Sequence, residues 1–228
     1  MTTALALIEA LTEARERVRR EPTTRKRLAR LQRWQVQRLR RTYADFERDP
    51  RYAEALEFFV SDLYGPHEYS RRDRDLRKVL SSWERLLPPR ASRAVVAALE
   101  LEALSHDLDL EMVSALQDTQ LDGVTYANAY RRVGRRPDRV RQIELIQFAG
   151  AALDDLVRMP VIGAALRMAR TPARLAGVTY LHQFLERGYR AFARMRDARP
   201  LLQAIQQRET RLMNALFAGE SAPDVETR

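Results

Sequence analysis

The sequence predicts an all-α fold, a single-domain multi-helix bundle of about eight to ten helices. Three observations indicate this fold. Apolar residues recur at helical spacing along the whole chain, and no segment alternates polar and apolar residues for the length of a strand. Proline and glycine divide the pattern into segments with short connections, which make consecutive helices neighbours. No repeat of fixed period is present, so a solenoid is not expected.

Each expected helix ends where proline or glycine interrupts the periodicity. Proline lacks the backbone donor that a helix interior needs but is favoured in a first turn, so it ends one helix and begins the next. Such stops occur at Glu21-Pro22, Gly65-Pro66 and Asp122-Gly123. The expected helices span residues 3–20, 24–47, 51–63, 71–87, 91–117, 124–134, 138–157, 161–170, 173–195 and 198–217.

The composition limits the class of protein. Of the 228 residues 45% are hydrophobic, enough for a substantial core, and the formal net charge is +9. The absence of cysteine excludes disulfides, thiolate nucleophiles and cysteine-ligated metals. Neither a secretory leader nor a membrane-length apolar run is recognised, so a cytoplasmic protein is expected. Residues 1–218 are predicted to form one helical domain, and residues 219–228 a disordered tail.

Basic charge is concentrated in residues 1–47, which are expected to form a basic N-terminal helical pair. Between Arg15 and Arg41 there are twelve basic and two acidic residues, so this segment carries +10 while the rest of the chain is nearly neutral. Trp34 lies among these arginines, and an aromatic side chain among guanidinium groups suits binding to an acidic protein, a nucleic acid or an anionic membrane surface. Alternatively, Trp34 packs against the first helix and the arginines are solvated or paired with acidic residues elsewhere. A helical projection places these residues on one face: Arg27, Arg30, Trp34, Arg38 and Arg41.

The segment FFVSDLYGPHEYSRRDRDL, residues 58–76, combines aromatic, charged and turn-forming residues. Tyr52, Leu56, Phe59 and Leu63 lie at helical spacing and predict a buried face, with Phe58 at its edge. Gly65 followed by proline is expected to end this helix. The remaining polar residues suit a carboxylate–guanidinium clamp between two helices or, alternatively, a ligand or catalytic site. These corner residues are Asp62, Tyr64, His67, Arg72 and Asp75.

Several stretches resemble one known family. FFVSDLYGP, with RRDRD close behind, is similar to the bacterial FFLEELY motif proteins, and so are YANAYRRVGRRPDRVRQIELI, GAALDDLVRMPVIGAALRMARTPARLAG, FLERGYRAFARM and RETRL. The resemblance covers most of residues 30–217. Val60, Ser61 and Asp62 stand where the family label has Leu, Glu and Glu, so only one of the two carboxylates is kept. The resemblance implies no activity, cofactor or catalytic residue.

The sequence predicts neither a metal site nor a catalytic set. Glu102 and His106 lie four residues apart on one expected helix, and His182 and Glu186 on another, with Glu144 as a further carboxylate. The Glu-x-x-His pattern of carboxylate-bridged metal sites is absent, so surface or boundary pairs are the favoured interpretation. No nucleophile motif or glycine-rich phosphate loop is present, and no cofactor is expected.

The leading functional hypothesis is a non-enzymatic adaptor that engages an acidic protein partner through the arginine-rich second helix. The alternative is an all-α enzyme or a small-molecule or lipid-binding protein with a pocket between helices. Its polar groups would come from Asp62, Tyr64, Arg72, Tyr130, Glu144 or His182. A third hypothesis is a nucleic-acid or membrane-surface binder that uses the same basic helix.

Overall fold

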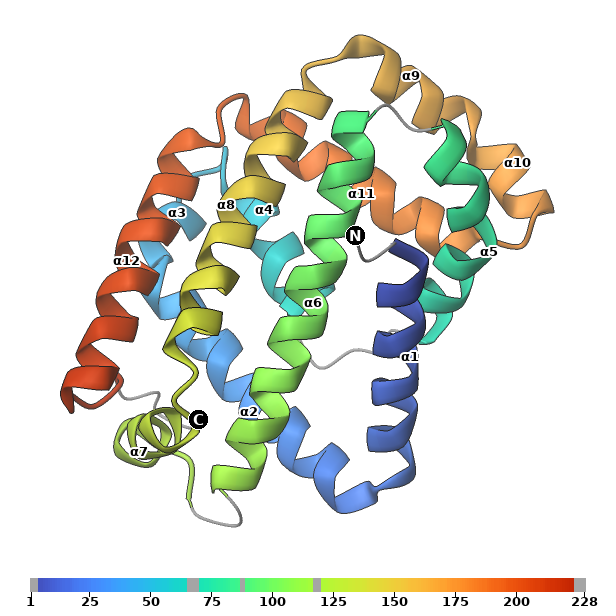
Figure 1. Ribbon diagram of the computed structural model, residues 1–228. Helices are drawn as coiled ribbons and strands as arrows, with labels where there is room; N and C mark the ends of the chain where they lie inside the picture. Colours follow the sequence, from blue (N-terminus) through green and yellow to red (C-terminus); the bar gives the residue numbers. More distant parts are fainter. Residues whose placement is uncertain (1–3, 65–69, 87–88, 117–119, 224–228) are drawn as a thin grey trace.

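The computed structural model describes residues 4–64, 70–86, 89–116 and 120–223. Over these ranges the chain forms twelve α-helices and one π-helical segment without any β-strand, so the all-α prediction is confirmed and the helix count is higher than predicted (Figure 1). No described helix is long and apolar enough to cross a membrane. The elements are α1 (Ala4–Arg20), α2 (Pro22–Thr42), α3 (Ala44–Glu47), α4 (Ala53–Phe58), η1 (Phe59–Tyr64), α5 (Ser70–Leu86), α6 (Pro89–Leu116), α7 (Gly123–Val133), α8 (Arg136–Val157), α9 (Pro160–Met168), α10 (Arg170–Leu175), α11 (Thr179–Met195) and α12 (Arg199–Ala218).

Three predicted helices are divided in the structure. The predicted helix 24–47 breaks at Tyr43 into α2 and α3, and the predicted helix 51–63 changes to π geometry at Phe59. The predicted helix 173–195 is interrupted at Gly177, which adopts a φ of +66° that only glycine reaches without strain. The Gly177 amide bonds to the Arg174 carbonyl, and the next amide bonds to the Ala173 carbonyl. This pair of bonds is a Schellman motif, so α10 ends there and α11 starts in a new direction.

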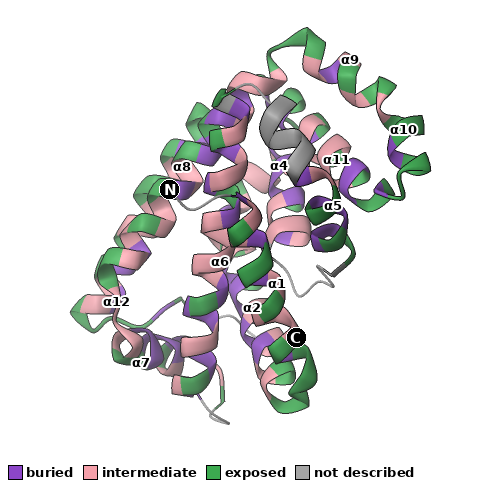
Figure 2. Cartoon of the chain, turned by 45° about the vertical axis from the view of Figure 1, so that its right-hand side comes forward, coloured by how far each residue is buried: buried purple, intermediate pink, exposed green. Residues whose placement is uncertain are grey.

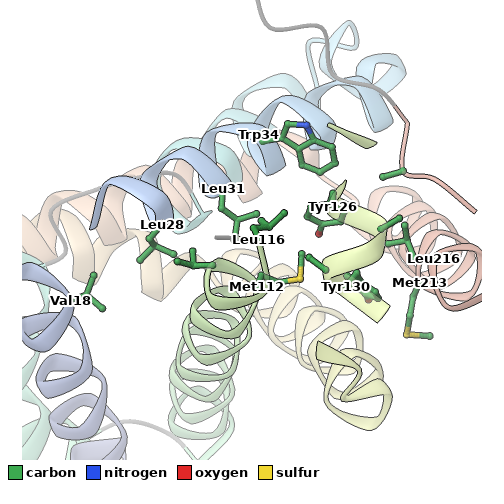
Figure 3. Close-up of a cluster of buried hydrophobic side chains, with 14 residues drawn as sticks. Val18, Leu28, Leu31, Trp34, Met112, Leu116, Tyr126, Tyr130, Met213 and Leu216 are labelled. Atoms are coloured by element: carbon green, nitrogen blue, oxygen red, sulfur yellow. The ribbon is translucent and has the colours of Figure 1, made fainter. Parts of the chain in front are cut away.

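Buried apolar side chains form three clusters around α6 and α8, which pack side by side through the middle of the molecule (Figures 1 and 2). The first cluster joins α2, α6, α7 and α12, and Figure 3 shows Leu31 and Met112 at its centre. The second joins α3, α4, α11 and α12, and the third joins α1, α5, α6 and α11. Because Ile8 and Leu31 are almost fully buried, the basic N-terminal pair belongs to the core.

The chain following α12 folds back against α7. Gly219 ends the helix in a left-handed conformation. The Ala222 amide then donates to the Gly123 carbonyl at 3.0 Å, and the Ala222 side chain is buried in the first cluster. The described part of the segment 219–228 therefore contacts α7 through Ala222.

The FFVSDLY segment packs on α11. The Phe58 ring contacts the Phe184 ring at 5.3 Å between centroids, and the Phe59 ring contacts the Phe192 ring at 5.7 Å. Gly188 lies midway between these two α11 rings, and a Cβ atom there would lie 2.9 Å from Cζ of Phe58. The side chain of Phe58 is buried whereas that of Phe59 is half-buried, so the predicted face is shifted where the π-helix begins. The absent side chain at residue 188 therefore permits this contact.

We expect Gly188→Ala to destabilise the fold by about 1–3 kcal/mol, because the new methyl group would overlap the buried Phe58 ring. In an unobstructed helix the same change would stabilise by about 1 kcal/mol. Urea denaturation measures the difference. Phe58→Leu removes the atoms that would overlap, so the double variant should recover most of the loss. Additive effects of the two substitutions would contradict a steric cause.

Candidate functional site

The predicted arginine face of α2 does not exist as one surface. The Trp34 ring stacks on Tyr126 of α7 at 4.3 Å between centroids and is 6% exposed (Figure 3). Arg38 is also buried, and its Nη1 donates to Oε1 of Glu209 on α12 at 2.6 Å. Two of the five predicted partner-binding residues are therefore core residues. A helical projection groups them correctly but does not reveal that α6, α7 and α12 cover this side of α2.

The other three residues of the predicted face differ in exposure. Arg27 and Arg30 are half-buried and Arg41 is exposed. Exposed basic side chains gather instead where α1 and α2 meet, at the lower edge of the molecule in Figure 1. We call this group the basic tip; it consists of Arg19, Arg20, Arg25 and Lys26.

The basic tip is only partly compensated by acidic groups. Arg19 pairs with Glu16 at 2.7 Å, and Glu21 accepts a hydrogen bond from the Thr24 hydroxyl at 3.0 Å. Neither Arg20, Arg25 nor Lys26 forms an ion pair with another residue that the structure describes. Surface charges of this kind are fully hydrated and accessible to an anionic partner. The tip is therefore the candidate binding site.

A second polar region lies inside the bundle, between α2, α6 and α8. Gln35 Nε2 donates to Oδ1 of the buried Asp109 at 3.1 Å. Burial raises the pKa of Asp109 to about 6, although the Gln35 hydrogen bond and the Arg139 charge oppose the rise. The Arg139 guanidinium lies over the Tyr130 ring at 4.4 Å. Nε and Nη2 of Arg139 and Nε1 of Trp34 have no hydrogen-bond partner among the described residues, and groups of this kind usually bind ordered water.

Four charged side chains from α1, α5 and α6 form one buried network. Arg15 donates to Asp73 at 2.6 Å and to Glu102 at 3.3 Å, and Arg72 donates to the same carboxylates at 3.2 and 2.7 Å. All four side chains are at least four-fifths buried. Burial opposes the charge of Arg72, but the Glu102 and Asp73 carboxylates outweigh it and raise the Arg72 pKa. We call Arg15, Arg72, Asp73 and Glu102 the four-charge cluster; it joins α1, α5 and α6.

The three described corner side chains, Asp62, Arg72 and Asp75, each have a partner outside the corner. Asp62 pairs with Arg187 of α11. Arg72 belongs to the four-charge cluster, and Asp75 accepts a hydrogen bond from the Leu181 amide in the first turn of α11 at 3.3 Å. His67 and the side chain of Tyr64 lie outside the described residues. The described corner residues thus tie η1 and α5 to α11 and α6, and they do not converge on a common ligand site.

The suggested metal pairs are engaged in other contacts. Glu102 is held by two arginines, while Glu186 accepts from Arg170 at 2.7 Å and His182 Nε2 lies 2.8 Å from the Leu166 carbonyl. Glu144 is exposed and lies 3.7 Å from Arg141. Within the described ranges, no three histidine or acidic side chains come together as possible metal ligands.

The polar residues suggested for a pocket are dispersed. Tyr130 lies in the first apolar cluster, His182 faces α9, and Asp62 pairs with α11. A void lined by Leu39, Tyr43, Leu56 and Val60 measures about 10 Å³, which is no more than the space of one water molecule. Sequence reasoning named Arg72 for a carboxylate–guanidinium clamp but did not place Arg15, Asp73 and Glu102 with it, because the four residues come from three helices and carry no common spacing signal.

We expect Asp73→Asn to destabilise the fold by about 3–5 kcal/mol, because it leaves the buried guanidinium groups without half of their compensating charge. Urea denaturation at neutral pH measures this loss. Glu100→Gln is a matched control, since its ion pair with Arg141 is exposed and should contribute less than about 1 kcal/mol. Equal losses of unfolding free energy in the two variants would show that the buried four-charge cluster contributes no more to stability than an exposed ion pair.

His106 predicts a pH dependence. Burial, with the charges of Arg15 and Arg17, lowers its pKa to about 4, whereas the unfolded chain has the ordinary value of about 6.5. Between these values the unfolded state binds the extra proton, so stability is lost as the pH falls. The wild type should lose about 2 kcal/mol more than His106→Gln between pH 7 and pH 5. The raised pKa of Asp109 makes stability rise as the pH falls, but this contribution is the same in both proteins and cancels in their difference. Parallel stability profiles of the two proteins between pH 7 and pH 5 would disprove a depressed pKa of His106.

Comparison with known families gives one match. A family model described as "Domain of unknown function (DUF8198)" matches residues 14–223. No curated protein and no solved structure matches the chain significantly. The resemblance to the FFLEELY motif proteins is not tested by this match and stays a prediction. Because the match includes both the basic tip and the four-charge cluster and covers far more than half of the sequence, the chain belongs to the DUF8198 family.

Proposed function

We propose that the chain is a non-enzymatic adaptor that engages an acidic protein partner through the basic tip. The observation that carries this proposal is the position of Arg25 and Lys26 near the start of α2, whose first turn contains no acidic residue. The amide groups of a helix N-terminus already concentrate positive potential there, and among residues 21–26 only the N-cap Glu21 opposes it, so added cations near this end are unfavourable. Such a local conflict is typical of functional surfaces, since an acidic ligand would relieve it.

The tip is held rigidly. Val18 near the end of α1 and Leu28 near the start of α2 are both buried in the first apolar cluster. Pro22 occupies the first position of α2 and fixes the backbone φ angle at the turn. A partner would therefore meet cations on an ordered turn, and less backbone entropy would be lost on binding.

The chemistry of the tip favours a protein over a nucleic acid. Proteins that bind single strands combine basic residues with aromatic side chains on which bases stack. Residues 15–33 contain no aromatic residue, and Trp34 is stacked on Tyr126 in the core. The tip thus offers charge without a stacking platform, which suits carboxylate side chains on a protein surface.

The triple variant Arg20→Glu/Arg25→Glu/Lys26→Glu should bind a fluorescent glutamate-rich peptide at least about 10-fold more weakly than the wild type at low salt, a difference of about 1.4 kcal/mol. Arg25→Glu and Lys26→Glu place acidic side chains near the start of α2, where they are favourable, whereas Arg20→Glu places one at the end of α1, where it is unfavourable. Because these effects oppose each other, thermal stability should change little. Fluorescence anisotropy and thermal unfolding monitored by circular dichroism provide the two measurements.

A variant with the same change in net charge serves as the control. Arg93, Arg190 and Arg211 are exposed and lie outside the tip, and their replacement by glutamate should leave peptide binding within about twofold. Equal weakening in both triple variants would mean that the peptide senses overall charge only and would contradict the proposal. Tighter, steeply salt-dependent binding of RNA or DNA would assign the tip to nucleic acid instead.

A further inference from the structure

Exposed apolar side chains are concentrated on one small part of the molecule. Val161 on α9, Met168 at its end and Leu175 at the end of α10 are 61%, 79% and 81% exposed. Met159 and Tyr180, which flank these helices, are also about half exposed. The only other large apolar residues exposed to this degree in the described ranges are Val124 and Phe148. Burial is therefore weakest along α9 and α10, which form the outer edge of the molecule (Figures 1 and 2).

α9 and α10 are nearly one continuous helix. The residue between them, Ala169, keeps a helical backbone with φ −72° and ψ −9°. The Ala169 amide donates to the Ala165 carbonyl, and the Ala173 amide to the Ala169 carbonyl, both at 2.8 Å. Residues seven apart lie on the same face of such a helix. Val161, Met168 and Leu175 have this spacing and define what we call the arm face.

The opposite side attaches the two helices to α11. A Cβ atom on Gly163 would lie 2.4 Å from the Tyr189 hydroxyl, so the Tyr189 side chain packs directly on the Gly163 backbone. Arg170 pairs with Glu186 at 2.7 Å, and the Leu166 carbonyl lies 2.8 Å from His182 Nε2. One side of the helix pair is thus fixed to the body, while the arm face points away from it.

The arm face is bordered by positive charge. Arg167 and Arg174 immediately precede Met168 and Leu175, so they lie about 100° around the helix from the apolar residues. The segment from Leu156 to Leu185 contains no acidic residue, and its basic residues are Arg158, Arg167, Arg170 and Arg174. Bulky apolar side chains beside arginines are the composition of helices that lie in a membrane interface, where the arginines reach lipid phosphates.

We infer that the arm face docks on an anionic lipid membrane, with Val161, Met168 and Leu175 entering the boundary between headgroups and acyl chains. A second copy of the chain is a poor occupant, because its identical arm would bring arginines against arginines. An acidic protein would account for the arginines but would not explain why the three most exposed apolar side chains lie beside them. A bilayer with anionic headgroups satisfies both features, and the edge position of α9 and α10 lets them reach a flat surface.

Co-flotation of the full-length protein with phosphatidylcholine vesicles containing about 30 mol% phosphatidylserine tests this inference. The wild type should float with these vesicles and bind at least about 10-fold less to pure phosphatidylcholine. Met168→Ser/Leu175→Ser should weaken binding at least about 10-fold, since it removes the inserted apolar groups. Arg167→Glu/Arg174→Glu should abolish the preference for anionic lipid.

The control Val124→Ser/Phe148→Ser removes two exposed apolar residues elsewhere and should bind as the wild type does. All substituted residues are exposed, so thermal unfolding should change little. Absence of wild-type binding at low salt, or unchanged binding of Met168→Ser/Leu175→Ser, would overturn the inference. Wild-type self-association that this variant abolishes, without vesicle binding, would overturn it in favour of a second copy.

The basic-tip triple variant separates this inference from the proposed function. It should keep flotation that depends on Met168 and Leu175 while losing the glutamate-rich peptide. Loss of flotation in the tip variant together with normal flotation of Met168→Ser/Leu175→Ser would place membrane contact at the tip and overturn docking through the arm face.

Discussion

The arrangement of the helices depends on the neutralisation of buried guanidinium groups. Arg15 and Arg72 share Asp73 and Glu102, Arg38 pairs with Glu209, and Arg139 lies near Asp109. Each set joins helices that are far apart in the sequence, such as α2 with α12. Removing one partner leaves an uncompensated charge in the interior, so such pairs specify one arrangement even where they add little net stability. Apolar burial drives collapse of this bundle, and the buried charges restrict which helices meet.

The helices could be predicted from the sequence because their periodicity and stops are local. The partners could not, because pairs such as Arg38 with Glu209 carry no spacing signal. Trp34 and Arg38 illustrate the limit: the projection placed them on one face correctly, but it could not show that α7 and α12 cover that face. Gly177 was a missed local signal, since its positive φ separates α10 from α11 although the apolar periodicity continues through it. The basic tip was foreseen only as part of a larger charged segment.

Exposed arginines are scattered over the surface, but two separated places combine exposed cations with a distinctive setting, the basic tip and the arm face. The tip is at the lower edge of Figure 1, and α9 and α10 are at the upper edge. The two surfaces differ in chemistry: the tip carries charge without exposed bulky apolar groups, whereas the arm face combines apolar side chains with arginines. Binding through charge alone is weakened strongly by salt, because salt screens the attraction to an anionic partner. Binding that also inserts apolar side chains is weakened less. Their separation would allow both surfaces to be occupied at once.

The FFVSDLY segment packs against α11, and its contacts there give it a structural role. Phe58 packs against Phe184 over Gly188, and Asp62 pairs with Arg187. On the following helix α5, Asp75 accepts a hydrogen bond from the Leu181 amide of α11. The opposite contacts of α11, through Glu186 and Tyr189, carry α9 and α10. α11 therefore stands between the motif and the arm face. Phe58 at the end of α4 and Phe59 at the start of η1 both pack on α11, so the motif contacts the same helix to which α9 and α10 are attached.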